Sequence, residues 1–262
     1  MRYLAAAQTD MGNVKKVNQD SLTVKVAQTP QGQIVLAVIC DGMGGLSYGE
    51  VASSHVVLAF EEWFRTECRQ LIAEALSEGD IRIEDIRSSW YRIVHQCNDT
   101  IVSYGRQNAT NVGTTLTAVL FVKDNYYLIH VGDCRVYELT ENMVQITNDQ
   151  TFVRREVELG HMTPEQAAND PRRNVLLQCV GVNYGIEPDF ICGKIRPNAS
   201  YLLCTDGFRH MITPQEIYET CHADNNRSIE SMNLHLKELI DVNKKRKEKD
   251  NISAILVRTL CT

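Results

Sequence analysis

The chain contains the stretch Ile34-Val35-Leu36-Ala37-Val38-Ile39-Cys40-Asp41-Gly42-Met43-Gly44-Gly45, in which seven apolar residues lead into an aspartate and a glycine-rich turn. An apolar run of this length, bounded by turn residues, is typical of a buried β-strand. Asp-Gly is also an ordinary turn former, so this stretch alone is compatible with a simple turn. We therefore looked for the same pattern elsewhere in the chain.

Three further aspartates stand beside apolar, strand-like runs, and these are Asp133, Asp206 and Asp250. Carboxylates held together on strand ends repel one another unless cations lie between them. Oxygen-only ligands select hard ions such as Mg²⁺ or Mn²⁺. The recurrence of the pattern favours a metal site over a set of unrelated turns.

Composition limits the class of protein. A chain of 262 residues, 44% of them hydrophobic and 23% charged, is long enough to bury a sizeable core, and we expect a single domain over residues 1–262. No run approaches the roughly 18 uncharged apolar residues that a membrane span requires. We therefore expect a cytoplasmic protein with no membrane partner. The nine cysteines form no Cys-x-x-Cys pair and are expected to be reduced, mostly buried thiols.

Charge argues against nucleic acid as a partner, because the formal net charge is -6. One basic run, Lys244-Lys245-Arg246-Lys247-Glu248-Lys249, closes a helical pattern. Cations suit the negative end of a helix dipole, so the run is interpreted as a solvated helix end. Docking of an acidic partner is the alternative.

The predicted strands come in hairpin runs, and the predicted helices come in two separate pairs. Strands are expected at 3–7, 22–26, 34–40, 115–122, 126–131, 135–139, 143–147, 189–195, 201–205 and 252–257, and helices at 50–63, 83–104, 214–222 and 228–243. The four strands between 115 and 147 are expected to form one antiparallel meander. This order does not suit a parallel sheet and predicts an α+β fold, a β-sandwich covered by helices on both outer faces.

The segment 148–173 is polar, contains Gly160, Pro164 and Pro171, and has few apolar anchors. We expect short helical stretches here and interpret the segment as a mobile flap inserted into the fold.

The motifs occur in a fixed order along the chain: Gly12 to Asp20, Asp41 to Gly45, Gly113-Thr114-Thr115, Val131 to Arg135, Cys204 to Gly207 and Asp250-Asn251-Ile252. This set resembles the type-2C metal-dependent protein phosphatases, the PPM family, and its compact bacterial members. The resemblance implies a four-layer αββα sandwich, in which two antiparallel sheets are flanked by helix pairs, with a binuclear Mg²⁺ or Mn²⁺ centre. It also implies hydrolysis of phosphoserine and phosphothreonine in proteins, a cognate Ser/Thr kinase among the substrates, and a monomer.

The resemblance assigns roles to individual residues. Asp41 would bridge both metals, Asp206 and Asp250 would complete one coordination sphere, and the Gly42 carbonyl would join the other. Asp20 would hold metal-bound waters. The nucleophile would be a metal-bound hydroxide, not a side chain.

The resemblance gives Asp133 the role of a ligand for a third, more weakly bound metal ion beneath the flap. Such an ion would position a water that protonates the leaving oxygen.

Two residues depart from the family pattern, and both lie in the first motif. The resemblance places Gln19 and Asn251 beside the metal ligands. The family usually has Glu where Gln19 stands, and Gln offers only a neutral oxygen or a hydrogen bond in its place. It usually has Arg where Lys15 stands, to grip the substrate phosphate. Lys15 could do so only as a point charge, or it could be a solvated lysine.

Two rival functions remain open at this stage. The departures at Gln19 and Lys15 are compatible with a phosphoprotein-binding pseudophosphatase. The segment Cys221-His222-Ala223-Asp224-Asn225-Asn226-Arg227 has the Cys-x₅-Arg spacing of a cysteine-dependent phosphatase. It lacks the glycines of a phosphate-cradling loop and follows a helical pattern, which favours a chance match.

Overall fold

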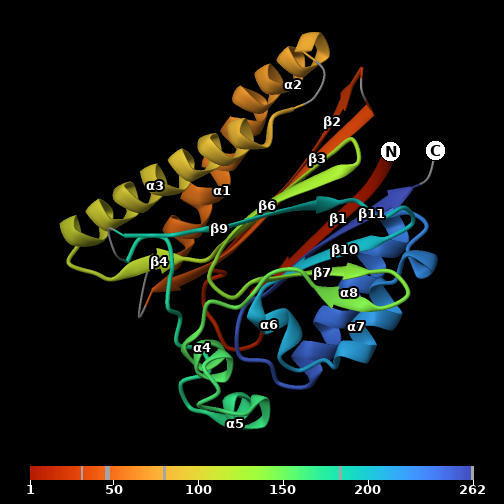
Figure 1. Cartoon of the computed structure of the whole chain (residues 1–262). Coiled ribbons are helices and arrows are strands. Elements are labelled where there is room, and N and C mark those ends of the chain that lie inside the picture. The colour runs from red at the N-terminus through yellow and green to blue at the C-terminus, as the bar shows by residue number, and fades with distance from the viewer. Residues whose placement is uncertain (31, 45–47, 79–80, 183–184, 261–262) are drawn as a thin grey trace.

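The computed structural model describes residues 1–30, 32–44, 48–78, 81–182 and 185–260. Two antiparallel sheets lie face to face (Figure 1). The first contains, in spatial order, β1 (Arg2–Asp10), β11 (Ile252–Leu260), β10 (Ser200–Cys204), β7 (Arg135–Leu139) and β8 (Met143–Gln145). The second contains β2 (Asp20–Thr29), β3 (Gly32–Gly44), β5 (Leu116–Val122), β6 (Asn125–Val131) and β9 (Asp189–Lys194), with β4 (Val112–Thr114) paired to the end of β3.

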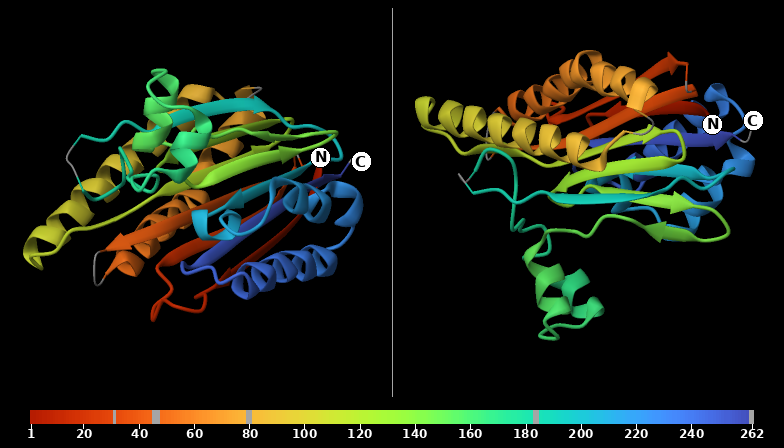
Figure 2. Two further views of the ribbon diagram at one scale, coloured as in Figure 1. Left: turned by 90° about the horizontal axis from the view of Figure 1, so that it is seen from below. Right: turned by 45° about the horizontal axis from the view of Figure 1, so that its top comes forward.

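Helices cover the outer face of each sheet, as Figures 1 and 2 show. The second sheet is covered by α1 (Gly49–Arg65), α2 (Glu67–Glu78) and α3 (Ile83–Gln107). The first sheet is covered by α7 (Pro214–Cys221) and α8 (Ile229–Lys245), with the short α6 (Asp206–Arg209) and the 3₁₀ helix η1 (Ala223–Asn225) nearby. The predicted α+β sandwich with helices on both faces is confirmed.

The strand β3 shows why the apolar run from Ile34 to Cys40 is continuous instead of alternating. Val35 and Ile39 pack into the core between the two sheets. Leu36 and Val38 point the other way, into the core beneath α1 and α3. Both faces of β3 are therefore buried, and both need apolar side chains.

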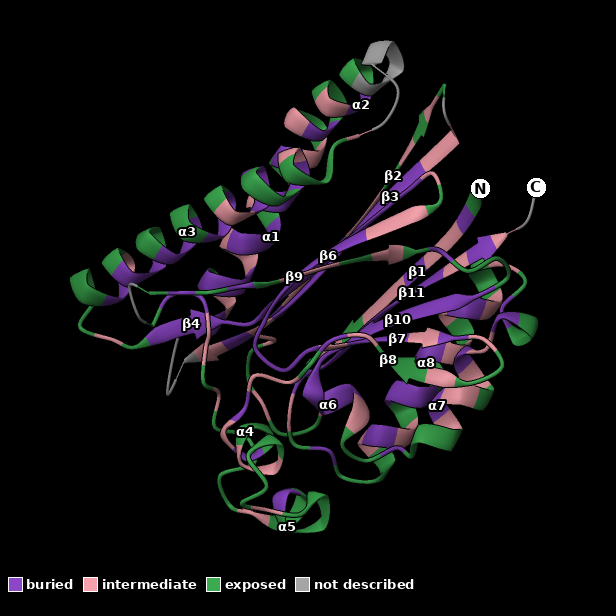
Figure 3. Cartoon of the chain, viewed as in Figure 1, coloured by how far each residue is buried: buried purple, intermediate pink, exposed green. Residues whose placement is uncertain are grey.

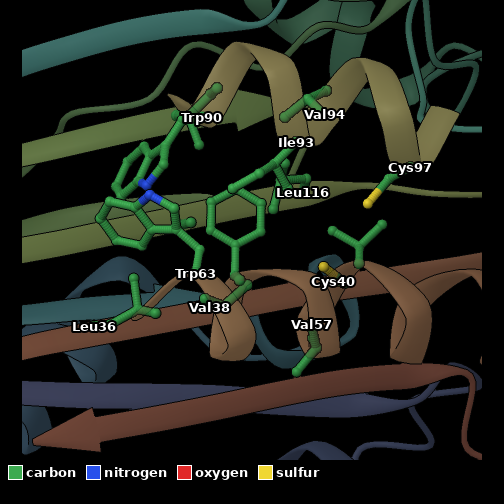
Figure 4. Packing of buried hydrophobic residues seen from close by; sticks show 14 of the residues in the cluster. Leu36, Val38, Cys40, Val57, Trp63, Trp90, Ile93, Val94, Cys97 and Leu116 are labelled. Carbon is green, nitrogen blue, oxygen red and sulfur yellow. The ribbon is translucent and has the colours of Figure 1, made fainter. Parts of the chain in front are cut away.

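The core beneath α1 and α3 is built around two tryptophans, Trp63 and Trp90 (Figure 4). Their ring centroids lie 5.3 Å apart in an edge-to-face arrangement, and Trp63 Nε1 donates a hydrogen bond to Ser89 Oγ at 3.0 Å. Most of the central strands and much of the helix surface that faces the sheets are buried (Figure 3). This packing fixes α1 against α3.

The predicted meander is wrong, because its four strands belong to two sheets. β5 and β6 pair in the second sheet, whereas β7 and β8 pair in the first. The free edge of β6 pairs with β9 instead. The chain crosses between the sheets at Gly132, where φ is +107° and a Cβ would lie 2.6 Å from Thr115 Cγ2. Even spacing of strands and turns does not reveal such a crossing.

Four elements were not predicted from the sequence: α2, β4 and the short helices α6 and η1. The helix α2 begins directly after α1, with only Thr66 between them, so no glycine or proline marks a new element. The strand β4 has only three residues. Gly44 ends β3, and residues 45–47 lie outside the described residues, so the tight turn expected at Gly44 and Gly45 stays a prediction.

The segment 148–173 projects away from the sandwich and contains two short helices, α4 (Phe152–Glu158) and α5 (Pro164–Asn169) (Figures 1 and 2). A capping box at Thr163 starts α5, with Pro164 in its first turn. We keep the name flap for residues 148–173. Its mobility stays a prediction.

In the part of the chain that the structure describes, no helix is both long and apolar enough to cross a bilayer. The eight cysteines in this part are free, and six of them are buried.

Candidate metal centre

Strand ends from both sheets bring the predicted aspartates into one cluster. Asp20 and Asp41 face each other across β2 and β3 of the second sheet. In the first sheet, Asp206 follows β10, and Asp250 lies just before its neighbour β11. Burial raises the pKa of Asp41, and the carboxylates of the other three aspartates and of Asp133 raise it further. The other four carboxylates are therefore all within electrostatic reach of Asp41.

The alternation of side chains along the strands directs two of these carboxylates into the space between the sheets. Ala37 and Ile39 of β3 pack in the core between the sheets, and Asp41 continues the same face. Asp20 has the same relation to Leu22 in β2. The carboxylates thus face the sheet that carries Asp206 and Asp250.

The backbone of Asp41 is fixed by the Gly113-Thr114-Thr115 motif. The N–H of Asp41 donates to Thr115 Oγ1 at 2.8 Å. Its carbonyl accepts from the Thr115 N–H at 2.9 Å and from Thr114 Oγ1 at 3.0 Å. The strand end is therefore rigid, while the side chain of Asp41 is left to other partners.

Gly42 lies where α1 approaches β3. A Cβ at this position would overlap the carbonyl oxygens of Gln19 and Gly49, so no other residue fits. Gln19 approaches the same place: its carbonyl accepts from the Gly42 N–H at 3.1 Å, and its Nε2 lies 3.5 Å from Glu50 Oε2. Gln19 is thus placed beside the predicted ligand Gly42.

Asp206 and Asp250 are brought together by close packing of α6 on the start of β11. A Cβ on Gly207 would overlap the Asn251 carbonyl oxygen and lie 3.2 Å from Asp250 Cβ. The Asn251 N–H donates to Asp250 Oδ1 at 2.9 Å. The glycine after Asp206 is therefore required by packing.

Two buried carboxylate oxygens in this cluster lack donors. Asp20 is 7% exposed and Asp206 is 8% exposed. Thr205 Oγ1 donates to Asp20 Oδ2 at 3.2 Å, but no group among the described residues hydrogen-bonds Asp20 Oδ1 or Asp206 Oδ1. Burial, helped by Asp206, raises the pKa of Asp20 to about 7. Buried oxygens of this kind are costly without a partner and suit a bound cation.

The donor set fits a hard divalent ion, since it consists of carboxylates and a carbonyl. Among the described residues, no group of three or more His, Cys, Asp or Glu side chains is arranged so that it could hold a metal ion without further ligands. Mg²⁺ typically takes one or two carboxylates and several waters, and carboxylates converge only when a cation offsets their repulsion. The residues therefore fit the ion through a mixed set of side chains, backbone and water.

Lys15 supplies a cation to this cluster. Its Nζ lies 2.8 Å from Asp250 Oδ1, and its side chain is 39% exposed. Burial alone would lower the pKa of Lys15, but the ion pair with Asp250, assisted by Asp41 and Asp206, raises it. In this arrangement Lys15 is paired with Asp250 and is partly exposed, and its role toward a phosphate stays a prediction.

Asn251 ties the loop before β2 to the cluster. Its Oδ1 accepts from the Gln19 N–H at 2.9 Å. Its Nδ2 donates to the carbonyls of Met11 at 2.9 Å and Val17 at 3.2 Å. The loop that carries Lys15 is thus anchored beside Asp250.

Asp133 lies in the crossing between β6 and β7, and charged residues surround it. Arg209 Nη2 is 3.7 Å from Asp133 Oδ2 and 3.9 Å from Asp149 Oδ2. Burial raises the pKa of Asp133 to about 6, with a further contribution from Asp206. Asp149, at the start of the flap, accepts bonds from Arg135 Nε and Nη2 at 2.9 and 2.6 Å.

Three residues near the cluster were missed from the sequence: His210, Glu248 and Arg209. His210 Nε2 lies 3.6 Å from Asp206 Oδ2, and its Nδ1 lies 3.6 Å from Glu248 Oε2. Glu248 Oε1 accepts from the Asp250 N–H at 2.9 Å. His210 and Glu248 therefore connect Asp206 with Asp250. Arg209 and His210 follow Asp206 by three and four residues in the sequence, and this spacing could have indicated that they lie near it.

The cysteine-dependent alternative is wrong. Cys221 is completely buried in the core under α7 and α8, and burial raises the pKa of its thiol. Arg227 Nε donates to the Asp224 carbonyl at 3.0 Å. A buried, protonated thiol cannot attack a phosphate.

Comparison with known sequences shows a match between residues 12–256 and the protein phosphatase 2C family. The chain is 32% identical over 222 residues to the serine/threonine protein phosphatase PstP of Mycobacterium tuberculosis. That alignment covers 84% of this chain and 38% of the relative, so the chain spans well under half of the length of the mycobacterial protein.

Solved structures share the fold over nearly the whole chain. The serine/threonine phosphatase of S. agalactiae has a TM-score of 0.84 and 25% identity, covering 98% of this chain and 100% of that one. The catalytic domain of PstP in complex with two manganese ions has a TM-score of 0.77 and 27% identity, covering 99% of each chain.

Proposed function

The chain belongs to the protein phosphatase 2C family, and from this we propose that it hydrolyses phosphoserine and phosphothreonine in proteins by means of two Mg²⁺ or Mn²⁺ ions. The observation that carries the proposal is the imbalance of charge in the cluster. Four carboxylates, those of Asp20, Asp41, Asp206 and Asp250, gather there, and Lys15 offers one ammonium. Two divalent cations would offset this excess.

The ligand roles are proposed as follows. Asp41 would bridge the two ions, Asp206 and Asp250 would complete one coordination sphere, and the Gly42 carbonyl would join the other. Asp20 would hold coordinated waters through its free Oδ1. The bound ions would supply an activated water for attack on phosphorus and neutralise charge on the phosphate.

Lys15 would bind the substrate phosphate. In the present arrangement its ammonium contacts Asp250, and its side chain remains partly exposed. Once the carboxylate is neutralised, the ammonium is free to donate to a phosphate oxygen as a point charge. The same side chain would thus exchange one anionic partner for another.

The flap lies beside the proposed centre, because Asp149 at its start is close to Arg209 and Asp133. We propose that residues 148–173 contact the protein part of the substrate. Phosphorylated Ser/Thr proteins, a cognate Ser/Thr kinase among them, are the proposed partners, and residues 1–262 are proposed to act as one monomeric domain.

Hydrolysis of a phosphothreonine peptide tests the proposal. Activity should require Mn²⁺ or Mg²⁺, disappear with a chelator and return when the metal is restored. Cys221→Ser should remain active, because its thiol is buried away from the centre. Binding of the phosphopeptide without metal-dependent hydrolysis would instead establish the pseudophosphatase alternative.

A further inference from the structure

Arg209 is a buried cation beside Asp133. Its side chain is 14% exposed, and its Nη2 donates to the Asp133 carbonyl at 3.1 Å. The same nitrogen is 3.7 Å from the Asp133 carboxylate and 3.9 Å from that of Asp149. Arg209 Nε is buried, and no acceptor among the described residues reaches it. Its guanidinium thus faces the two carboxylates, not the solvent where a substrate would arrive.

The carboxylate of Asp149 already accepts hydrogen bonds from other side chains on both of its oxygens. Arg135 Nε contacts both of its oxygens, at 2.9 and 3.0 Å, and Arg135 Nη2 contacts Oδ2 at 2.6 Å. Gln145 Nε2 adds a hydrogen bond to Oδ1 at 3.0 Å. These contacts leave Asp149 little capacity to bind a metal ion.

The chain therefore supplies cations of its own around Asp133, although the carboxylate of Asp206 is also within electrostatic reach. The two carboxylates of Asp133 and Asp149 face the two guanidiniums of Arg209 and Arg135. The cluster around Asp41 is more acidic, since four carboxylates gather there around the Lys15 ammonium and the His210 imidazole. A divalent cation at Asp133 would also meet the positive charge of Arg209, and this repulsion weakens its binding.

We propose that Arg209 is the resident counter-ion of Asp133, so that the chain binds metal at the Asp41 cluster and not at Asp133. This inference rests on the proposed function for the two ions, and it replaces the third ion that the resemblance assigned to Asp133. Arg209 is a positioning residue here: it links α6, which begins with the ligand Asp206, to the start of the flap.

The number of bound Mn²⁺ ions tests this inference, measured by equilibrium dialysis up to millimolar metal. Wild type and Arg209→Lys, which keeps the charge, should each bind two ions. Arg209→Met, which removes the charge and keeps most of the length, should bind a third. The affinity for this third ion should be on the order of tenfold or more above the detection limit that the wild-type titration sets. The double variant Arg209→Met/Asp133→Asn should lose that ion.

The comparison between Arg209→Met and the double variant isolates the Asp133 site from the Asp41 cluster. Equal ion counts in these two proteins would overturn the inference. Should Arg209→Met not fold, as judged by circular dichroism, Asp133→Asn in the wild-type background decides instead. An unchanged count supports the counter-ion, and a count reduced from three to two overturns it. Failure of the proposed function would look different, as a deficit of the two core ions in every variant.

Discussion

At the scale of single residues, Lys15 and Gln19 determine how the carboxylate cluster differs from the family pattern. Lys15 Nζ contacts Asp250 Oδ1 at 2.8 Å, so an ion bound at the proposed site would compete with this ammonium for the same carboxylate. Gln19 Nε2 lies 3.5 Å from Glu50 Oε2, where an acidic residue would place two carboxylates side by side. Each residue therefore gives a prediction about metal affinity.

Lys15→Met should tighten Mn²⁺ binding, because it removes the competing cation. It should also raise the KM for a phosphothreonine peptide by about tenfold, the worth of one hydrogen bond to a charged group. Calorimetric Mn²⁺ titration and steady-state kinetics measure the two effects separately. Lys15→Arg serves as the matched control and should lower the KM, since its fork can bind a phosphate through two donors. If both variants behave like wild type, Lys15 has no role at the centre.

Gln19→Glu should lower the Mn²⁺ concentration needed for half-maximal activity, because the new carboxylate adds negative charge beside Gly42. Without metal, the same variant should melt at a lower temperature than wild type, since the carboxylates at 19 and 50 repel each other. A metal titration and a melting curve in chelator measure these effects. An unchanged or higher metal requirement would show that position 19 does not act on the ions.

At the scale of elements, the short helix α6 holds Asp206 against the start of β11. Gly207 makes this possible, because a Cβ there would overlap the Asn251 carbonyl oxygen. His210, on the next turn, connects Asp206 with Glu248 and so with the Asp250 N–H. The distance between Asp206 and Asp250 therefore depends on how closely α6 packs.

Gly207→Ala should push α6 away from β11. We expect a loss of about 1–3 kcal/mol in the free energy of unfolding, the usual cost of overpacking, together with weaker Mn²⁺ binding. Gly185→Ala is a suitable control, because a Cβ at Gly185 meets no atom within 4 Å among the described residues. Denaturant unfolding and calorimetry measure both quantities. If Gly207→Ala matches Gly185→Ala in both, the packing of α6 does not control the centre.

Much of the arrangement of elements could be predicted, since strong local patterns specify it. The apolar run in β3 and the amphipathic stripe of α3 correctly indicated a buried strand and a helix. The crossing after β6 could not be predicted, because hydrophobic spacing does not say which sheet a strand joins. The same limit applies to side chains: Glu248 reaches His210 only through tertiary packing.

At the scale of the whole molecule, the cluster joins the two sheets. Asp20 and Asp41 come from the second sheet, whereas Asp206 and Asp250 flank strands of the first. The strand-end aspartates could be recognised in the sequence because each follows or precedes an apolar run. The neutralising contacts of Arg209 could not, because Asp133 and Asp149 are distant from it in sequence.

The most direct test of the central claim is the turnover number of Asp206→Asn on a phosphothreonine peptide at saturating Mn²⁺. The substitution keeps the size of the side chain and removes its charge from the proposed metal sphere. We predict a fall of at least about 10³-fold with an unchanged circular dichroism spectrum, because stabilisation by a metal ion is worth several kcal/mol in the transition state. A turnover number near that of wild type would contradict the assignment of this cluster as the catalytic metal centre.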